Sequence, residues 1–217
     1  MNKYEIFRLT LNFFEFLAFV TGLFFISKLK YTYWKWFVVY LGIIVFAELF
    51  SEFRQLIQKK PNQWLYVWFI IPFEFLFFYW LYFKYFRYTE YRRWPLIMSI
   101  IYAAAYIIDM TYLRHMQFAF SSFSYLAGTV LLLILILLFF ARLAKGYEAG
   151  NFKKDIMFWV STGLLIFFLG SLPFYGLWNT IRVANREFFN SYWMVQMTFN
   201  CLMYLFFTLS FVWGKPK

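Results

Sequence analysis

Seven runs of about 20 or more mainly apolar residues dominate this sequence, and each is long enough to cross the hydrocarbon core of a bilayer as an α-helix. Their bounds are about 6–27, 33–54, 63–86, 94–113, 118–143, 156–178 and 188–213. Because lipid offers the backbone no hydrogen-bond partners, such runs fold as helices. The sequence therefore predicts an all-α fold, a polytopic integral membrane protein whose residues 1–217 form a single seven-helix transmembrane bundle.

Composition and charge support a membrane protein. Hydrophobic residues make up 64% of the 217 residues and charged residues 14%, whereas soluble domains carry about 45–50% and about 25%. The net charge is +11, which in a soluble protein would suggest nucleic acid as a partner. No polar stretch here is long enough to form a soluble module, so we expect basic loops that contact anionic lipid head groups and no nucleic-acid partner.

The distribution of Lys and Arg among the loops predicts the orientation. Thirteen of the 21 basic residues lie on the side of the C-terminus, and eight lie on the side of the N-terminus. The positive-inside rule then places the N-terminus outside the cell and the C-terminus in the cytoplasm. The expected location is the cell membrane, as a multi-pass protein.

Five carboxylates share one layer in this orientation. They lie at mid-depth or in the outer halves of four predicted spans, at Glu15, Glu48, Glu52, Glu74 and Asp109. A carboxylate at the centre of a span costs about 2.5–3.5 kcal/mol on insertion scales. That cost falls if the acids line a common, hydrated cavity that opens outward.

Helical spacing adds amides to the same layer. Asn12 lies one turn before Glu15, and Gln196 and Asn200 are four residues apart in the last span. We expect the five acids and these three amides to bind a cationic or protonatable ligand. In the alternative interpretation Glu48 and Glu52 reach the outer interface and pair with Arg8 or Arg54.

Two spans contain helix-disrupting residues. Pro72 lies two residues before Glu74, and Gly170 precedes Pro173 in the sixth span. Because proline removes a backbone donor and kinks a helix, these three positions are candidate hinges. The alternative is ordinary packing, since Gly and Pro are frequent in membrane helices.

Several function classes lack the residues that they need. A retinal protein needs a lysine in its last span, yet 188–213 contains none, and a ceramidase-type hydrolase needs several histidines where this chain has His115 alone. No Ser–His, Cys–His or glycine-rich phosphate motif is present. We therefore expect no cofactor and doubt an enzyme, although a carboxylate cluster can hold a hard cation such as calcium.

The segments "FAELFSEF", "IPFEF" and "FWVSTGLLIFFLGSLPF" resemble those of small, uncharacterised bacterial seven-helix membrane proteins. That family is associated with genes near sensor histidine kinases. The resemblance implies the bacterial inner membrane, a sensory or regulatory role and a sensor histidine kinase or other signalling protein as partner. The positions to which it points are Glu48, Glu52, Pro72 and Glu74.

Four functions remain open. The favoured one is a membrane receptor or signalling subunit that binds its ligand in an outward cavity and shifts between two helix packings. The main alternative is a proton- or cation-coupled transporter or channel, because acid-lined membrane cavities are typical of ion pathways. An intramembrane enzyme that acts on lipid and an assembly subunit are the other two.

Overall fold

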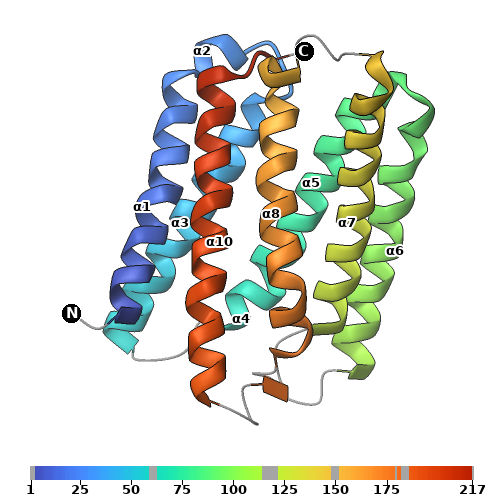
Figure 1. Cartoon of the computed structure of the whole chain (residues 1–217). Coiled ribbons are helices and arrows are strands. Elements are labelled where there is room, and N and C mark those ends of the chain that lie inside the picture. The colour runs from blue at the N-terminus through green and yellow to red at the C-terminus, as the bar shows by residue number, and fades with distance from the viewer. Residues whose placement is uncertain are drawn as a thin grey trace. The chain divides into compact units, whose positions relative to one another are not determined.

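The computed structural model describes residues 3–58, 63–113, 122–147, 152–178, 180–181 and 186–216, and within them the protein is all-α (Figure 1). Seven helices in these ranges are long and apolar enough to cross a membrane. They run over Glu5–Phe24, Lys35–Gln55, Tyr66–Tyr88, Glu90–Leu113, Ser122–Lys145, Ile156–Gly176 and Glu187–Trp213. The predicted all-α class and the prediction of seven helices that could span a membrane are confirmed, while the orientation across the membrane stays a prediction.

The spans are built from these elements: α1 (Lys3–Phe24), α2 (Ile26–Leu29), α3 (Lys35–Gln58), α4 (Gln63–Leu65), the π-helix η1 (Tyr66–Ile70), α5 (Ile71–Tyr85), the 3₁₀ turns η2 (Phe86–Tyr88) and η3 (Glu90–Arg93), α6 (Trp94–Ile108), the π-helix η4 (Asp109–Leu113), α7 (Ser122–Arg142), the π-helix η5 (Leu143–Tyr147), the 3₁₀ turn η6 (Phe152–Lys154), α8 (Ile156–Gly176) and α10 (Arg186–Trp213).

The predicted bounds agree with these elements to within a few residues. The first span ends three residues earlier than predicted, because the chain turns after Phe24 into the separate helix α2. The fourth starts four residues earlier, since η3 leads directly into α6. Residues 118–121 of the predicted fifth span lie outside the described residues.

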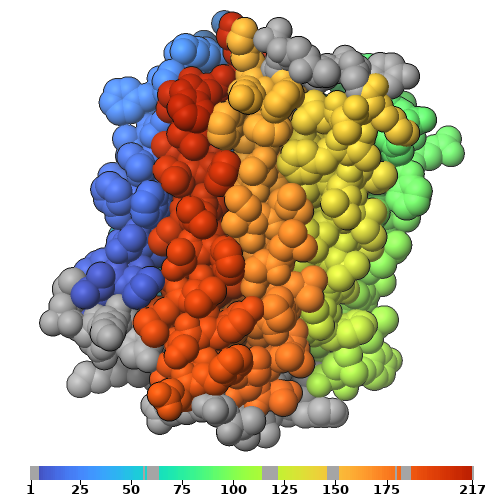
Figure 2. Space-filling model, viewed as in Figure 1, coloured from blue at the N-terminus to red at the C-terminus, as the bar shows by residue number. Residues whose placement is uncertain are grey.

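The chain divides into two compact units. The first comprises Met1–Leu49, Ile136–Ser171 and Asn190–Lys217, and the second comprises Phe50–Leu135 and Leu172–Phe189. In the first unit α1 and α10 run in the same direction and α3 runs against them (Figure 1). Figure 2 shows α1, α10 and the first-unit part of α8 next to one another on the viewed face.

Aromatic side chains fill the core of the first unit. Phe37 of α3 is completely buried, and its ring centroid lies 5.1 Å from that of Phe207 and 5.5 Å from that of Phe211, both on α10. At the C-terminal end the Lys215 N–H donates to the Lys154 carbonyl, and the Asp155 carboxylate accepts from the Met157 N–H at 2.9 Å. The last residues are thereby held at the start of α8, which Asp155 caps.

The second unit also has an aromatic core. The ring centroid of Phe75 on α5 lies 5.0 Å from that of Tyr102 on α6 and 5.6 Å from that of Tyr125 on α7. Gly128 allows α7 to approach, since a Cβ there would lie 2.8 Å from the Tyr102 ring. The Tyr79 hydroxyl donates to the Gly128 carbonyl at 2.9 Å.

Candidate functional site

The buried face of α1 carries a carboxylate. Leu11, Glu15, Ala18 and Gly22 follow one another at helical spacing and are all buried, and Glu15 is only 3% exposed. Its side chain therefore belongs to the interior of the first unit and does not reach an aqueous interface. Glu15 also lies close enough to Cys201 on α10 for the carboxylate and the thiol to interact electrostatically.

The buried face of α10 carries two amides. Gln196, Asn200, Met203 and Phe207 repeat at helical spacing along it. Gln196 is completely buried, and neither its Oε1 nor its Nε2 has a hydrogen-bond partner among the described residues. The buried Oδ1 of Asn200 also lacks one within the same ranges.

These unsatisfied amides are energetically unusual. Burial of an amide without a compensating hydrogen bond costs about 2–7 kcal/mol, depending on the reference state. A membrane span has no nearby bulk water to reduce that cost. A buried polar group without a protein partner calls for an explanation, such as a bound water or ion, a functional role or stored strain.

Five of the eight predicted ligand-binding residues lie in the first unit at a similar depth. Gln196 lies ten residues after the start of α10, Glu48 ten before the end of α3, and Asn12 nine after the start of α1. Within the first unit α1 and α10 run in the same direction, and α3 runs against them (Figure 1). With Glu15 and Asn200 these three residues form what we name the amide–carboxylate layer: Asn12, Glu15, Glu48, Gln196 and Asn200.

Helix α8 borders this layer through a close contact with α10. A Cβ on Gly170 would lie 2.4 Å from Cδ2 of Phe199, so only glycine allows the two helices to approach this closely. The Tyr192 hydroxyl donates to the Gly170 carbonyl across a long 3.3 Å. Close packing therefore accounts for Gly170, and its predicted hinge role is not needed to explain the residue.

The other predicted hinge residue of α8 lies nearby in the sequence. Pro173 lies inside the helix, which continues past it to Gly176. The division between the two units falls between Ser171 and Leu172, two residues before this proline. The structure leaves the hinge prediction for Pro173 open.

In the second unit Asp109 has a structural partner. It is 4% exposed, and its Oδ2 accepts a hydrogen bond from the Ser124 N–H at 2.9 Å in the first turn of α7. The first N–H groups of a helix have no intrahelical acceptor, and a carboxylate there also interacts favourably with the helix dipole. Asp109 thus stabilises the start of α7.

Pro72 interrupts the hydrogen bonding of its helix. Without an N–H it donates to neither Trp68 nor Val67, the acceptors at four and five residues before it. The preceding residue closes a π-turn, since the Ile71 N–H donates to the Tyr66 carbonyl. The Tyr106 hydroxyl lies 3.4 Å from the Val67 carbonyl oxygen and 3.4 Å from the Trp68 carbonyl oxygen.

Glu74 and Tyr102 form a second polar group in this unit. Tyr102 is 1% exposed, and its hydroxyl has no hydrogen-bond partner in the described part of the chain. Tyr106, Glu74 and Asp109 lie close enough to interact with it electrostatically. Glu74 itself is half-buried.

Glu52 is half-buried and also belongs to the second unit, where the guanidinium of neighbouring Arg54 lies over the Trp64 ring at 5.4 Å from its centroid.

Within the described ranges, no three His, Cys, Asp or Glu side chains group closely enough to hold a metal ion.

Helical spacing predicted Gln196 and Asn200 as site residues, but their burial without partners is a property of the packed chain. The capping role of Asp155 was not predicted, although an acid just before an apolar run is a known sign of a helix start. The capping role of Asp109 could not be predicted in this way, because Asp109 lies 15 residues before the Ser124 N–H that it accepts from. The proximity of Cys201 to Glu15 was not predicted either, because the two residues are far apart in the sequence.

The fold defines a class: an all-α, multi-pass membrane protein with seven candidate spans. No protein-family profile matches the sequence, and neither a curated protein nor a solved structure matches it significantly.

Proposed function

We propose that the protein is a membrane receptor or signalling subunit whose first unit binds a small cationic or protonatable ligand at the amide–carboxylate layer. The observation that carries the proposal is Gln196, which is completely buried and has two polar atoms without partners among the described residues. Hydrogen-bond donors on a positively charged ligand would satisfy the Gln196 Oε1 and the nearby Asn200 Oδ1, and an acceptor on the same ligand would satisfy the Gln196 Nε2. The Glu15 carboxylate supplies the complementary charge.

Ligand binding would act through the helix packing. A ligand shifts an equilibrium between two packings only by its difference in affinity for them. The tight contact of Gly170 with Phe199 makes α8 sensitive to small movements of α10. The receiver is a partner protein at the cytoplasmic end, and the sequence resemblance favours a sensor histidine kinase.

A thermal-shift assay on the purified protein tests the binding site. The probes are a panel of amines and guanidinium compounds, compared in wild type, Glu15→Gln and Gln196→Leu. Thr198→Val is the matched control, because Thr198 is an exposed polar residue two positions from Gln196.

A compound that binds should stabilise wild type by about 2.7 kcal/mol at 100 times its Kd. We expect the two site variants to lose this shift and Thr198→Val to keep it. If every compound that stabilises wild type stabilises all three variants equally, the layer is not the binding site.

The second candidate is a proton- or cation-coupled transporter. It is favoured by the half-buried Glu74 beside the Tyr102 hydroxyl, because intramembrane acids next to polar groups are typical of ion pathways. Flux measurements in proteoliposomes distinguish the two functions. Proton or cation flux that disappears in Glu74→Gln would favour the transporter and contradict the receptor.

A further inference from the structure

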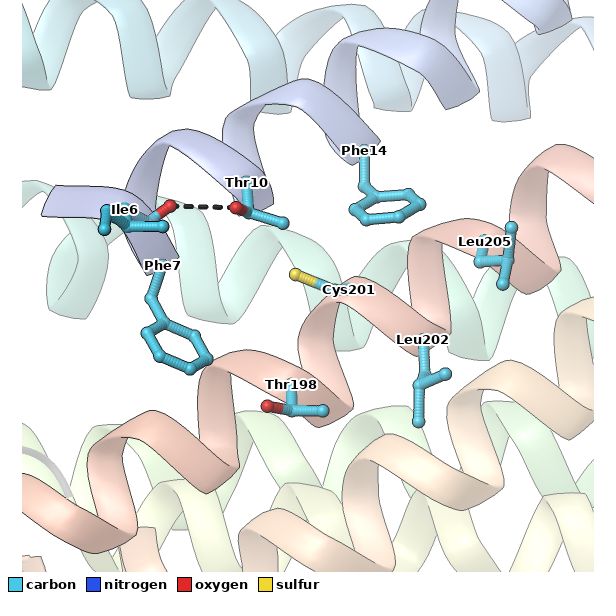
Figure 3. A pocket seen from close by; sticks show the side chains of 8 residues that line it. All are labelled: Ile6, Phe7, Thr10, Phe14, Thr198, Cys201, Leu202 and Leu205. Carbon is cyan, nitrogen blue, oxygen red and sulfur yellow. Dashed lines mark hydrogen bonds between the residues drawn. The ribbon is translucent and has the colours of Figure 1, made fainter. Parts of the chain in front are cut away.

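A recess of about 350 Å³ lies between α1 and α10 in the first unit, apart from the amide–carboxylate layer (Figure 3). Phe7 and Phe14 extend from α1 and Cys201 lies between the helices, with Leu202 and Leu205 farther along α10. We name this recess the α1–α10 groove; Ile6, Thr10 and Thr198 complete its lining. Its volume falls within the range of ligand pockets.

The groove is apolar despite its two threonines. The Thr10 hydroxyl donates to the Ile6 carbonyl at 2.8 Å, and the Thr198 hydroxyl donates to the Met194 carbonyl at 3.1 Å. Each hydroxyl is therefore satisfied within its own helix. Among the described residues no charged side chain lines the groove. Its walls therefore match a hydrocarbon occupant and offer nothing to recognise a polar one.

The groove is continuous with the surface that contacts the bilayer. Ile6 is 46% exposed and Leu202 is 36% exposed, and the neighbouring Leu9 and Phe13 of α1 are 49% and 60% exposed. All of these residues belong to candidate membrane spans. Apolar side chains exposed on a membrane span face acyl chains, so hydrocarbon has direct access to the recess.

We propose that the α1–α10 groove binds one acyl chain of a bilayer phospholipid. Lipid tails are as apolar as the groove, so dispersion contacts must retain the chain. A recess between two helices surrounds a chain on more sides than a flat helix face does, and an empty recess would lose those contacts. Because the lining carries no charge, retention should not depend on the phospholipid head group.

Native mass spectrometry of the purified full chain tests the proposal with phosphatidylglycerol and phosphatidylcholine as probes. Wild type should retain one phospholipid of either kind after detergent washing. Thr198→Trp, which fills the groove, should retain none. Leu169→Trp is the control, because Leu169 is 57% exposed on α8 and outside the groove.

Cys201, the only cysteine of the chain, provides a second measurement on wild type alone. An occupied groove should protect the thiol from N-ethylmaleimide, and occupancy of about nine-tenths slows the reaction about tenfold, since only the unoccupied fraction reacts. The proposal is overturned if phospholipid leaves the Cys201 reaction unchanged, if Thr198→Trp retains as much lipid as Leu169→Trp, or if Thr198→Trp instead abolishes a dimer of the chain.

Discussion

Gly170→Ala places a methyl group where the structure has no room for one. The added Cβ would lie 2.4 Å, 2.5 Å and 2.9 Å from Cδ2, Cε2 and Cγ of Phe199. Real Cβ atoms essentially never come closer than 3.0 Å to such atoms. The Phe199 ring must therefore rotate away, or α8 and α10 must separate locally.

The expected cost follows from this geometry. Overpacking of a filled site costs about 1–3 kcal/mol. Alanine is intrinsically better than glycine in a helix by about 0.5–1 kcal/mol, which offsets part of that cost. The net destabilisation should be about 0.5–2 kcal/mol, and for a chain of this length each kcal/mol lowers the melting temperature by about 2–4 °C.

Thermal unfolding in detergent measures this loss, and a double-mutant cycle identifies its cause. Phe199→Leu in the Gly170→Ala background should recover most of the stability, because the clashing ring atoms are removed. Gly22→Ala is the matched control and should cost less, since its Cβ would lie no closer than 3.1 Å to Phe211 or Val38. If Gly170→Ala is as stable as wild type, or if Phe199→Leu gives no recovery, the close-packing explanation is wrong.

Four further predictions concern helix ends, a prolyl interruption, a tyrosine outside the spans and the topology. Asp109→Ala should destabilise the protein by about 0.5–2 kcal/mol through loss of the α7 cap, whereas Asp109→Asn should retain part of that stability in the same unfolding assay. Tyr106→Phe should cost only about 0.5–1.5 kcal/mol, because its contacts to the two carbonyl oxygens are long, and a larger loss would show that the hydroxyl has a stronger partner. Burial and the nearby Asp155 carboxylate raise the pKa of the Tyr33 hydroxyl. As the pH rises above about 10, the unfolded state loses this proton before the native state does, so the free energy of unfolding should fall. Urea unfolding between about pH 9 and pH 11 should show a smaller fall for Tyr33→Phe than for wild type. A C-terminal alkaline phosphatase fusion should be inactive, and an active one would reverse the predicted orientation.

The membrane class and the number of spans could be predicted because each depends on local composition. A run of about 20 apolar residues forms a helix in lipid whatever its neighbours are, since only its own backbone groups can satisfy one another. The bounds were less certain where a turn lies inside an apolar stretch, as between Phe24 and Ile26. Hydropathy does not distinguish a continuous helix from two helices joined by one residue.

The candidate site could be predicted only in part. Helical spacing identified Gln196 and Asn200 as one face of the last span, and that face is buried. Spacing also suggested one shared layer of acids. The structure gives Asp109 a role as a cap of α7 and divides the eight residues between two compact units, so the shared layer stays a prediction.

By itself, therefore, the sequence determined the solvent of this protein, its secondary structure and the face of each helix that carries polar residues, because each is set by a periodic pattern within a single span. Only the tertiary structure decided which polar atoms find partners. Whether the amide of Gln196 forms hydrogen bonds depends on the atoms that neighbouring helices bring within reach. The close approach of the helices at Gly170 depends on the ring of Phe199, 29 residues away in the sequence. Both result from the packing of helices that are distant in the chain, and no pattern within one span encodes them.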